Sequence, residues 1–315
     1  MKAVFFGSSA YCLPIIKSVS THFLLEAIIA KKGSVAAGFA AGKIRLFEPL
    51  NKAELLSLKG EIHKIGVDLA LAADYGLIIP AEIFSLPRYG TINIHFSKLP
   101  EFRGASPVQY TLLSGAGQAW FTYQTMAGKM DTGNIIHQQK ISLQGREKTA
   151  ELYSTLFEKA AEILPEIING FISGEIKPIK QDETKTTYTK ILQRNDGFVP
   201  WSMFLEALSG KKAHQYSLSA DSAIRFALTH ASSLAQALER SVRALYPWPG
   251  VWTEIALSTG KKRLKIIEGE LTDWRFNPKT VQLEGKKPVA WRQFLAGYGE
   301  SLPSTSSIAL KSSLK

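Results

Sequence analysis

The sequence predicts an α/β fold, in which an open parallel sheet is followed by a smaller β-rich domain. In the first half, short apolar runs alternate with helical segments, which is typical of parallel strands joined by helices. These runs are Lys2–Phe6, Leu24–Ala30 and Asp68–Ala73. Further strand-like runs occur near the other end, at Trp252–Leu257, Arg263–Leu271 and Thr280–Leu283. The length of 315 residues is about twice that of an average domain, so we expect two domains.

The first strand is expected to lead directly into a helix. The run Lys2–Phe6 ends at Gly7-Ser8-Ser9, where Ser8 or Ser9 can cap a helix that begins near Ala10. These residues do not form the three-glycine fingerprint of dinucleotide-binding proteins. The Gly/Ala-rich stretch over residues 33–43 lacks the glycine spacing of a phosphate-binding loop, and we expect a surface loop there.

Composition along the chain also predicts the domain boundaries. Residues 149–170 place apolar side chains at helical spacing and end at a glycine, which predicts a helix. The Thr-rich stretch that follows is polar and has little to bury, which is typical of a linker. The predicted organisation is a first domain at 1–180, a linker at 181–200, a second domain at 201–302 and a flexible tail at 303–315.

The charge is concentrated in the last third of the chain. The sequence contains 38 basic and 27 acidic residues, a net charge of +11. Residues 201–315 hold 16 basic and 9 acidic residues, a net +7, and the remaining 200 residues hold a net +4. An excess of this kind favours a polyanionic partner, because neutralised phosphates release their condensed counterions. Charge that serves only solubility is the alternative.

Several classes of protein are excluded by composition. No apolar run approaches the roughly 20 residues needed to cross a bilayer, and Gly7 and Ser8 interrupt the opening run too early for a secretory signal. One cysteine, Cys12, leaves no disulfide framework and no cysteine zinc site. The six histidines show no ligand-like pairing. We therefore expect a cytoplasmic protein that binds neither a membrane nor a metal. As a separate expectation, which composition does not provide, the protein is a monomer.

The stretch GTINIHFSKLPEFRGASP, residues 90–107, is the densest in candidate chemistry. Its alternating strand places Asn93 and His95 on one face, two positions apart, at the strand's end. In open α/β sheets ligands bind in the crevice beyond the strand ends. An amide donor beside an imidazole suits acyl chemistry, since the amide can stabilise an oxyanion while the imidazole transfers protons. Alternatively, both side chains are satisfied by backbone groups and have no catalytic role.

A second candidate element is the turn KMDTGN, residues 129–134. An aspartate in a tight turn commonly caps that turn through its own side chain. The functional alternative is that Asp131 orients and charges His95, as the carboxylate does in other pairs of a base and its orienting group.

Together these motifs resemble the folate-dependent formyltransferases. INIHFSKLPEFRGASPVQY and MDTGNI are similar to that family's Asn-x-His, Ser-Leu-Leu-Pro and Met-Asp-x-Gly patterns, and further matches occur upstream and downstream. These are Ala72–Pro80, Arg88–Gly90, Gln181–Thr184, Thr187-Tyr188, Lys190, Ile224-Arg225, Val242–Gly250, Lys262–Glu270 and Leu283–Phe294. The matches from Gln181 onward favour the branch of the family that formylates methionyl-tRNA.

The resemblance implies a Rossmann-like formyltransferase domain followed by a β-barrel, OB-like domain that binds tRNA. It implies that 10-formyltetrahydrofolate donates the formyl group, without a metal, and that methionyl initiator tRNA accepts it for translation initiation. The implied catalytic residues are Asn93, His95 and Asp131, and the implied folate loop is Ser97, Lys98, Leu99 and Pro100. From the basic excess of the last third, the candidate tRNA contacts are Arg243, Lys261, Lys262, Arg263 and Lys265, with Lys43 added from the first domain. A solvated basic face is the alternative for these residues.

Three departures from the family pattern bear on these expectations. Lys98 replaces the usual leucine, Asn134 replaces the usual acidic residue, and residues 31–43 lack the family's paired basic pattern. With these departures the resemblance leaves open how the tRNA is discriminated, and the implied chemistry is intact. Two other functions are consistent with parts of the sequence: formylation of an amino-sugar nucleotide, and tRNA binding by a catalytically inactive relative.

Overall fold

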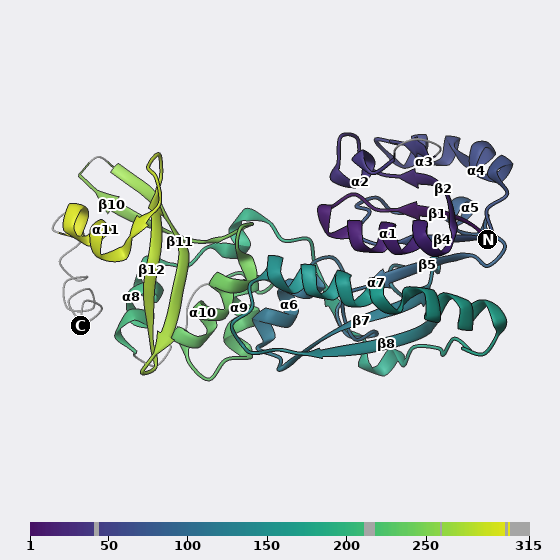
Figure 1. The fold of residues 1–315 in the computed structure, drawn as a ribbon. Coiled ribbons are helices and arrows are strands. Elements are labelled where there is room, and N and C mark those ends of the chain that lie inside the picture. Colours follow the sequence, from purple (N-terminus) through teal and green to yellow (C-terminus); the bar gives the residue numbers. More distant parts are fainter. Residues whose placement is uncertain (41–43, 211–217, 259, 300–301, 303–315) are drawn as a thin grey trace. The chain divides into compact units, whose positions relative to one another are not determined.

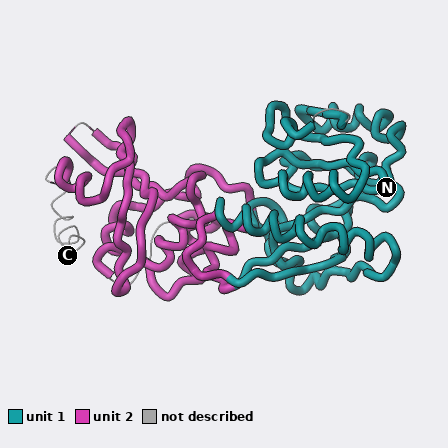
Figure 2. The backbone as a smooth tube through the Cα atoms, in the orientation of Figure 1, with its two compact units in different colours: residues 1–107, 118–142, 150–189 teal, residues 108–117, 143–149, 190–315 magenta. Residues whose placement is uncertain are grey.

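The computed structural model describes residues 1–40, 44–210, 218–258, 260–299 and 302 (Figure 1). The chain forms two compact units (Figure 2). Unit 1 comprises residues 1–107, 118–142 and 150–189, and unit 2 comprises residues 108–117, 143–149 and 190–315. The chain passes from unit 1 to unit 2 for the last time between Thr189 and Lys190, which lies inside the linker expected at 181–200. The sequence did not predict that two short segments of the first half belong to unit 2.

Unit 1 is built on a seven-stranded sheet with the order β3-β2-β1-β4-β5-β7-β8. The strands from β3 to β5 are parallel, whereas β5, β7 and β8 pair antiparallel. The bounds are β1 Lys2–Phe6, β2 Leu24–Ile29, β3 Arg45–Phe47, β4 Leu69–Ala72, β5 Thr91–His95, β7 Gln118–Thr125 and β8 Ile135–Ser142. This arrangement confirms the predicted open sheet of parallel strands, whereas the antiparallel strands β7 and β8 at one edge were not predicted.

Helices cover both faces of this sheet. On one face, α3 (Lys52–Ser57) and α4 (Lys59–Ile65) pack on the buried side chains of Val4 and Phe6. Elsewhere in unit 1, α1 (Leu13–His22) and α7 (Thr149–Ser173) contact each other, since the Ser18 hydroxyl donates to the Ala161 carbonyl over 2.9 Å. Burial on both faces explains why the parallel strands are almost continuously apolar.

The turn after β1 differs from the prediction in one detail. Pro14 does lie in the first turn of α1, where its missing N–H costs little. Ser9, however, makes no side-chain capping bond at the start of η1 (Ala10–Cys12). The Ser8 hydroxyl instead donates to the Tyr75 carbonyl over 3.0 Å and accepts the Lys31 N–H over 3.0 Å. Ser8 therefore ties three chain segments together rather than capping a helix.

The short segments of unit 1 are positioned around these strands. They are α2 (Val35–Gly38), α5 (Ala81–Phe84), η2 (Glu183–Lys185) and the small parallel pair β6 (Arg103–Gly104) and β9 (Tyr188–Thr189). The helix α2 lies in the stretch predicted as a surface loop, where the Ser34 hydroxyl caps it by accepting the Ala37 N–H over 3.3 Å.

Unit 2 contains a four-stranded antiparallel sheet with the order β10-β11-β12-β13. Its strands are β10 (Val251–Leu257), β11 (Gly260–Thr272), β12 (Arg275–Leu283) and β13 (Val289–Ala290). Its helical segments are α6 (Pro107–Ser114, of which residues 108–114 belong to unit 2), η3 (Arg194–Gly197), α8 (Trp201–Ser209), α9 (Ala223–Thr229), α10 (Leu234–Leu245) and α11 (Trp291–Tyr298). The predicted β-rich second part is confirmed, with longer strands than expected. None of the helices in the described ranges is long and apolar enough to span a membrane.

Candidate active site

The end of β5 carries two of the predicted site residues. Asn93 and His95 lie two positions apart on the strand, so their side chains leave the same face of the sheet. Strand β5 pairs with the parallel strand β4 on one side and with the antiparallel strand β7 on the other. His95 is only 6% exposed, and its Nε2 lies 2.9 Å from the Phe102 carbonyl oxygen.

Asp131 reaches the same place from the turn between β7 and β8. Its carboxylate accepts hydrogen bonds from the Gly104 N–H at 2.8 Å, the Gln124 amide at 2.9 Å and the Asn93 amide at 3.3 Å. Its Oδ1 lies 3.6 Å from the Nδ1 of His95. The structure therefore brings Asn93, His95 and Asp131 together, and each nitrogen of the imidazole faces an oxygen.

The backbone of the Asp131 turn is unusual. Asp131 has φ +54°, in the left-handed region that costs a non-glycine residue about 1 kcal/mol or more. Two residues on, a Cβ at Gly133 would lie 1.5 Å from the Thr125 carbonyl oxygen, so only glycine fits there. Hydrogen bonds to the carboxylate and close packing of the turn together hold this conformation.

The predicted folate loop, Ser97–Pro100, is held by hydrogen bonds from buried and half-buried side chains of the neighbouring strands β7 and β8. Ser97 and Leu99 are 1% and 2% exposed. The Thr122 hydroxyl donates to the Ser97 carbonyl over 2.6 Å, and the Gln138 amide donates to the Leu99 carbonyl over 2.9 Å. Lys98 is the exposed member of the four, with its Nζ 5.3 Å from the Trp120 ring centroid. The loop thus presents a shaped backbone edge and one cation, which fits a flat, carboxylate-bearing ligand.

Sequence reasoning missed the residues that surround Asp131. Gln124 was inconspicuous because it lies in an ordinary strand, and Gln181 because it lies in a polar stretch that looked like a linker. Gln181 is in fact only 4% exposed, and the fully buried Arg103 contacts it. The only available signal was the position of Gln181 and Arg103 within motifs that match the family.

The basic residues of β11 lie on both faces of their sheet. Lys261, Arg263 and Lys265 share one face, opposite Ala256, Glu254 and Trp252 of β10, whereas Lys262 is on the face that buries Leu264. Burial lowers the pKa of Lys265, whose Nζ donates to the Pro247 carbonyl over 3.1 Å.

Aromatic rings accompany these cations. The Arg263 guanidinium lies 4.9 Å from the Trp252 ring, the Lys265 ammonium 5.9 Å from the Tyr246 ring, and the Arg194 guanidinium 5.8 Å from the Trp248 ring. We call this set the cation–aromatic face; it consists of Arg194, Tyr246, Trp248, Trp252, Lys261, Arg263 and Lys265. Interleaved cations and rings are typical of surfaces that bind nucleic acid.

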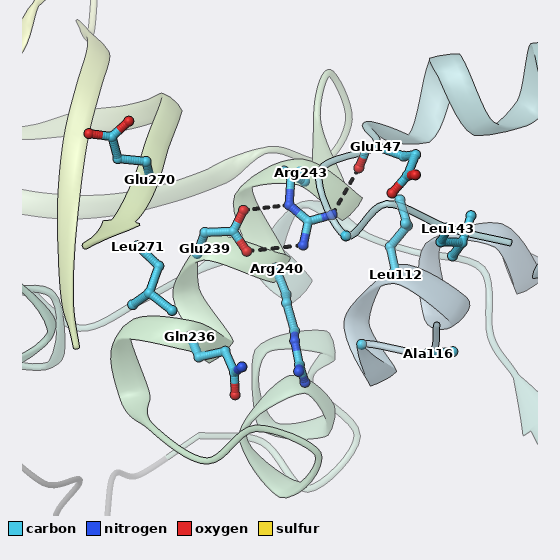
Figure 3. Close-up of a pocket in the computed structure, with 12 residues that line it drawn as sticks. Leu112, Ala116, Leu143, Glu147, Gln236, Glu239, Arg240, Arg243, Glu270 and Leu271 are labelled. Atoms are coloured by element: carbon cyan, nitrogen blue, oxygen red, sulfur yellow. Dashed lines mark hydrogen bonds and ion pairs between the residues drawn. The ribbon is translucent and has the colours of Figure 1, made fainter. Parts of the chain in front are cut away.

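Arg243 is placed differently from the expectation that it contacts tRNA. Its side chain is 11% exposed and forms a bidentate ion pair with Glu239, in which Nη2 donates over 3.0 Å. Its Nη1 donates to the Glu147 carbonyl over 2.9 Å. Arg243, Glu239 and Glu147 are among the residues that line a pocket of about 380 Å³ within unit 2. Figure 3 shows the Arg243 guanidinium between Glu239 and Glu147. Arg243 is therefore bound by partners in its own unit.

Lys43 lies outside the described residues. In the part of the chain that the structure describes, no group of three or more His, Cys, Asp or Glu side chains is arranged to hold a metal ion.

The sheet of unit 1 brings an amide and an imidazole at the end of β5 together with a carboxylate from the turn after β7, an arrangement suited to group transfer. The formyl transferase family model matches residues 31–168, and the formyl transferase C-terminal domain model matches residues 226–279. The chain belongs to the folate-dependent formyltransferase family.

Curated relatives give the same result. The chain is 31% identical over 228 residues to a methionyl-tRNA formyltransferase of Lachnospira eligens, an alignment that covers 72% of this chain and 61% of that protein. It is 24% identical to a methionyl-tRNA formyltransferase of Clostridium novyi, over 94% of this chain and 97% of that protein.

Solved structures share the fold. A methionyl-tRNA formyltransferase from Clostridium thermocellum superposes with a TM-score of 0.54 at 17% identity, covering 90% of this chain and 98% of that chain. An N-formyltransferase from Helicobacter canadensis, in complex with folinic acid and dTDP-3-aminofucose, superposes with a TM-score of 0.56 at 16% identity, over 92% and 98% of the two chains. At these identities the structures show a common fold and do not discriminate between substrates.

Proposed function

We propose that the protein transfers the formyl group of 10-formyltetrahydrofolate to the α-amine of methionyl-tRNA. The observation that carries this proposal is the convergence of Asn93, His95 and Asp131, in a chain whose relatives of that name align over nearly its full length. The reaction would supply formylmethionyl-tRNA for translation initiation in the cytoplasm.

The geometry supports a direct transfer between the two nitrogens. The neutral amine attacks the formyl carbon, a new C–N bond forms, and the carbonyl oxygen becomes an oxyanion. The Asn93 amide donates to Asp131 over a long 3.3 Å and can turn to the oxyanion. Protonated His95 would supply a second donor once its Nε2–H exchanges the Phe102 carbonyl for the oxyanion. Collapse of the intermediate re-forms the carbonyl and breaks the bond to the folate nitrogen. That nitrogen takes up the proton that the amine lost, returned by Asp131 directly or through water.

Asp131 stabilises the imidazolium and receives the proton that the amine loses, directly or through water. The Gly104 N–H and the Gln124 amide remain bonded to its carboxylate when Asn93 turns away. These donors keep the carboxylate oriented during the reaction.

The donor would lie against Ser97–Pro100, where the exposed Lys98 ammonium, 3.8 Å from the Glu101 carboxylate, can exchange that partner for the carboxylates of the folate tail. The accepting tRNA would bind unit 2 through the cation–aromatic face. Residues 201–302 are the proposed tRNA-binding domain, to which residues 108–117 and 143–149 are added by the observed unit. Lys261 and Arg263 are the proposed phosphate contacts, whereas Lys262 and Arg243 are less suited because of their placement.

An amino-sugar nucleotide is the second candidate acceptor, because the Helicobacter canadensis structure is of a fold neighbour that holds one. A nucleotide sugar offers too few phosphates for the net charge of +7 on residues 201–315. The direct test incubates the protein with 10-formyltetrahydrofolate and either methionyl-tRNA or dTDP-3-aminofucose. Mass spectrometry should find formyl-methionine on tRNA. A formylated sugar, with unmodified tRNA, would select the alternative, and no product from either would indicate an inactive relative.

A further inference from the structure

We propose that Gln181 is a positioning residue that sets the place of the Asp131 carboxylate, and that Arg103 orients Gln181 for this task. The inference rests on the proposed function only in assigning Asp131 a role in formyl transfer. It gives residues 181–189, which connect directly to unit 2 at Lys190, a part in the active site.

Gln181 holds the turn that carries Asp131. Its Nε2 donates to the Asp131 carbonyl over 2.8 Å and to the Gly133 carbonyl over 2.7 Å. Both N–H groups of the amide are therefore used on residues of one turn. Because Asp131 is in the left-handed region, these bonds restrain the backbone where it is least favourable.

Arg103 fixes the direction of that amide. Its Nε and Nη2 both donate to the Gln181 Oε1, over 3.1 Å and 2.8 Å. A guanidinium has donors only, so the amide oxygen must face Arg103 and the amide nitrogen must face Asp131. Arg103 is fully buried and is itself held by Glu183, through bonds of 3.0 Å and 2.8 Å.

The same segment reaches Asp131 a second time. Gly104, which follows Arg103 in β6, donates its N–H to the Asp131 Oδ2 over 2.8 Å. A Cβ at Gly104 would lie 2.5 Å from the Thr189 carbonyl oxygen, so this close approach of β6 to β9 requires glycine. The carbonyl and the carboxylate of Asp131 are thus both held by groups that belong to or are oriented by residues 103–104.

A purely structural role is the competing explanation, in which Gln181 merely supplies an acceptor for a buried arginine. Gln181→Glu separates the two roles, because at about pH 8 the glutamate keeps an oxygen for Arg103 but donates nothing to Asp131. Gln181→Met removes both functions. Gln139→Glu is the matched control, the same change in strand β8 of the same unit.

The experiment measures steady-state formylation of methionyl-tRNA by the full chain, with the KM of each substrate. We expect Gln181→Glu and Gln181→Met to lower kcat by ~10-fold or more, with each KM changed less than about 3-fold. The control should match the unaltered protein. A wild-type kcat in Gln181→Glu, or a loss confined to KM, would overturn the proposal. If Gln181→Met fails to fold, Gln181→Glu still decides.

Hydrogen exchange at the Gly104 amide gives a readout that requires no tRNA or other formyl-accepting substrate. Displacement of Asp131 removes the carboxylate oxygen that accepts the Gly104 N–H. Exchange at that amide should therefore accelerate by ~10-fold or more in both Gln181 variants but not in the control. Unchanged exchange would overturn the proposal even if kcat fell. If the unaltered protein does not formylate methionyl-tRNA, the proposed function fails, and the Gly104 measurement still tests whether Gln181 positions Asp131.

Discussion

The Asp131 carboxylate lies 3.6 Å from the Nδ1 of His95, and both side chains are more than nine-tenths buried. The two residues come from different elements, the end of β5 and the turn after β7. Burial at this separation strengthens the attraction between a carboxylate and an imidazolium relative to the same pair in water. The arrangement therefore places the Asp131 carboxylate beside the His95 imidazole, where the proposed oxyanion develops.

Replacing either partner should disable the chemistry without preventing binding. We expect His95→Ala and Asp131→Asn each to lower kcat by at least ~10², the usual scale for losing a general acid–base group or its orienting partner. Asn134→Asp, an exchange of amide and carboxylate at an exposed position of the same turn, is the control and should retain activity. Rapid-quench formylation assays on folded variants would make the comparison; near-wild-type turnover in either variant would remove that residue from the mechanism.

The turn that carries Asp131 should not tolerate a side chain at Gly133. Gly133→Ala should destabilise the protein by roughly 1–3 kcal/mol and lower kcat, because the new methyl group overlaps the Thr125 carbonyl and must push the turn away. Gly128→Ala is the control, since nothing lies within 4 Å of a Cβ at that position. Thermal unfolding and kcat measured on both variants check this; equal behaviour of the two would show that the turn tolerates the shift.

The fold was predictable because its signals are local. Alternating apolar runs indicated the strands, and Asn93 and His95 were found because a strand places residues i and i+2 on one face. Gln181 was not predictable: its polar neighbourhood resembles a linker, and its burial arises from contact with Arg103, 78 positions away in sequence. The ion pair between Arg243 and Glu239 was not predicted for the same reason. An arginine in a basic domain is expected to be exposed unless its partners are known.

The folate loop should depend on the support beneath it. Thr122→Val removes a fully buried hydroxyl that bonds the Ser97 carbonyl, and Pro100→Gly frees the backbone of the loop. We expect both to raise the Kd for the folate donor by ~5-fold or more while changing tRNA affinity little. Thr21→Val, which removes an exposed hydroxyl in α1, is the control. Calorimetry that found equal losses for folate and tRNA would contradict the assignment.

The cation–aromatic face should carry the electrostatic part of tRNA binding. Lys261→Ala with Arg263→Ala should weaken tRNA binding and flatten the dependence of log K on log salt by about 0.7–0.9 for each phosphate that these side chains neutralise. Arg292→Ala, an exposed arginine in α11, is the control. Point variants are preferable to deleting residues 201–315, because residues 108–117 and 143–149 belong to the same unit. An unchanged slope would place the tRNA elsewhere.

Arg243 should behave as a structural residue. Arg243→Ala leaves the largely buried Glu239 without its partner, so we expect a loss of roughly 3 kcal/mol in unfolding free energy. At a temperature where the variant is folded, the salt slope for tRNA should match that of the unaltered protein. Denaturant unfolding and filter binding measure the two quantities; a stable variant with a flattened slope would restore Arg243 as a phosphate contact.

Formylation of methionyl-tRNA by the unaltered protein, and by Asp131→Asn under the same conditions, tests the central claim most directly. The tRNA is incubated with 10-formyltetrahydrofolate, and the aminoacyl group is released and weighed by mass spectrometry. We expect formyl-methionine with the unaltered protein and at least ~10² less in the same time with the variant. Methionine that stays unmodified in both samples, while the unaltered protein still binds the donor, would contradict it.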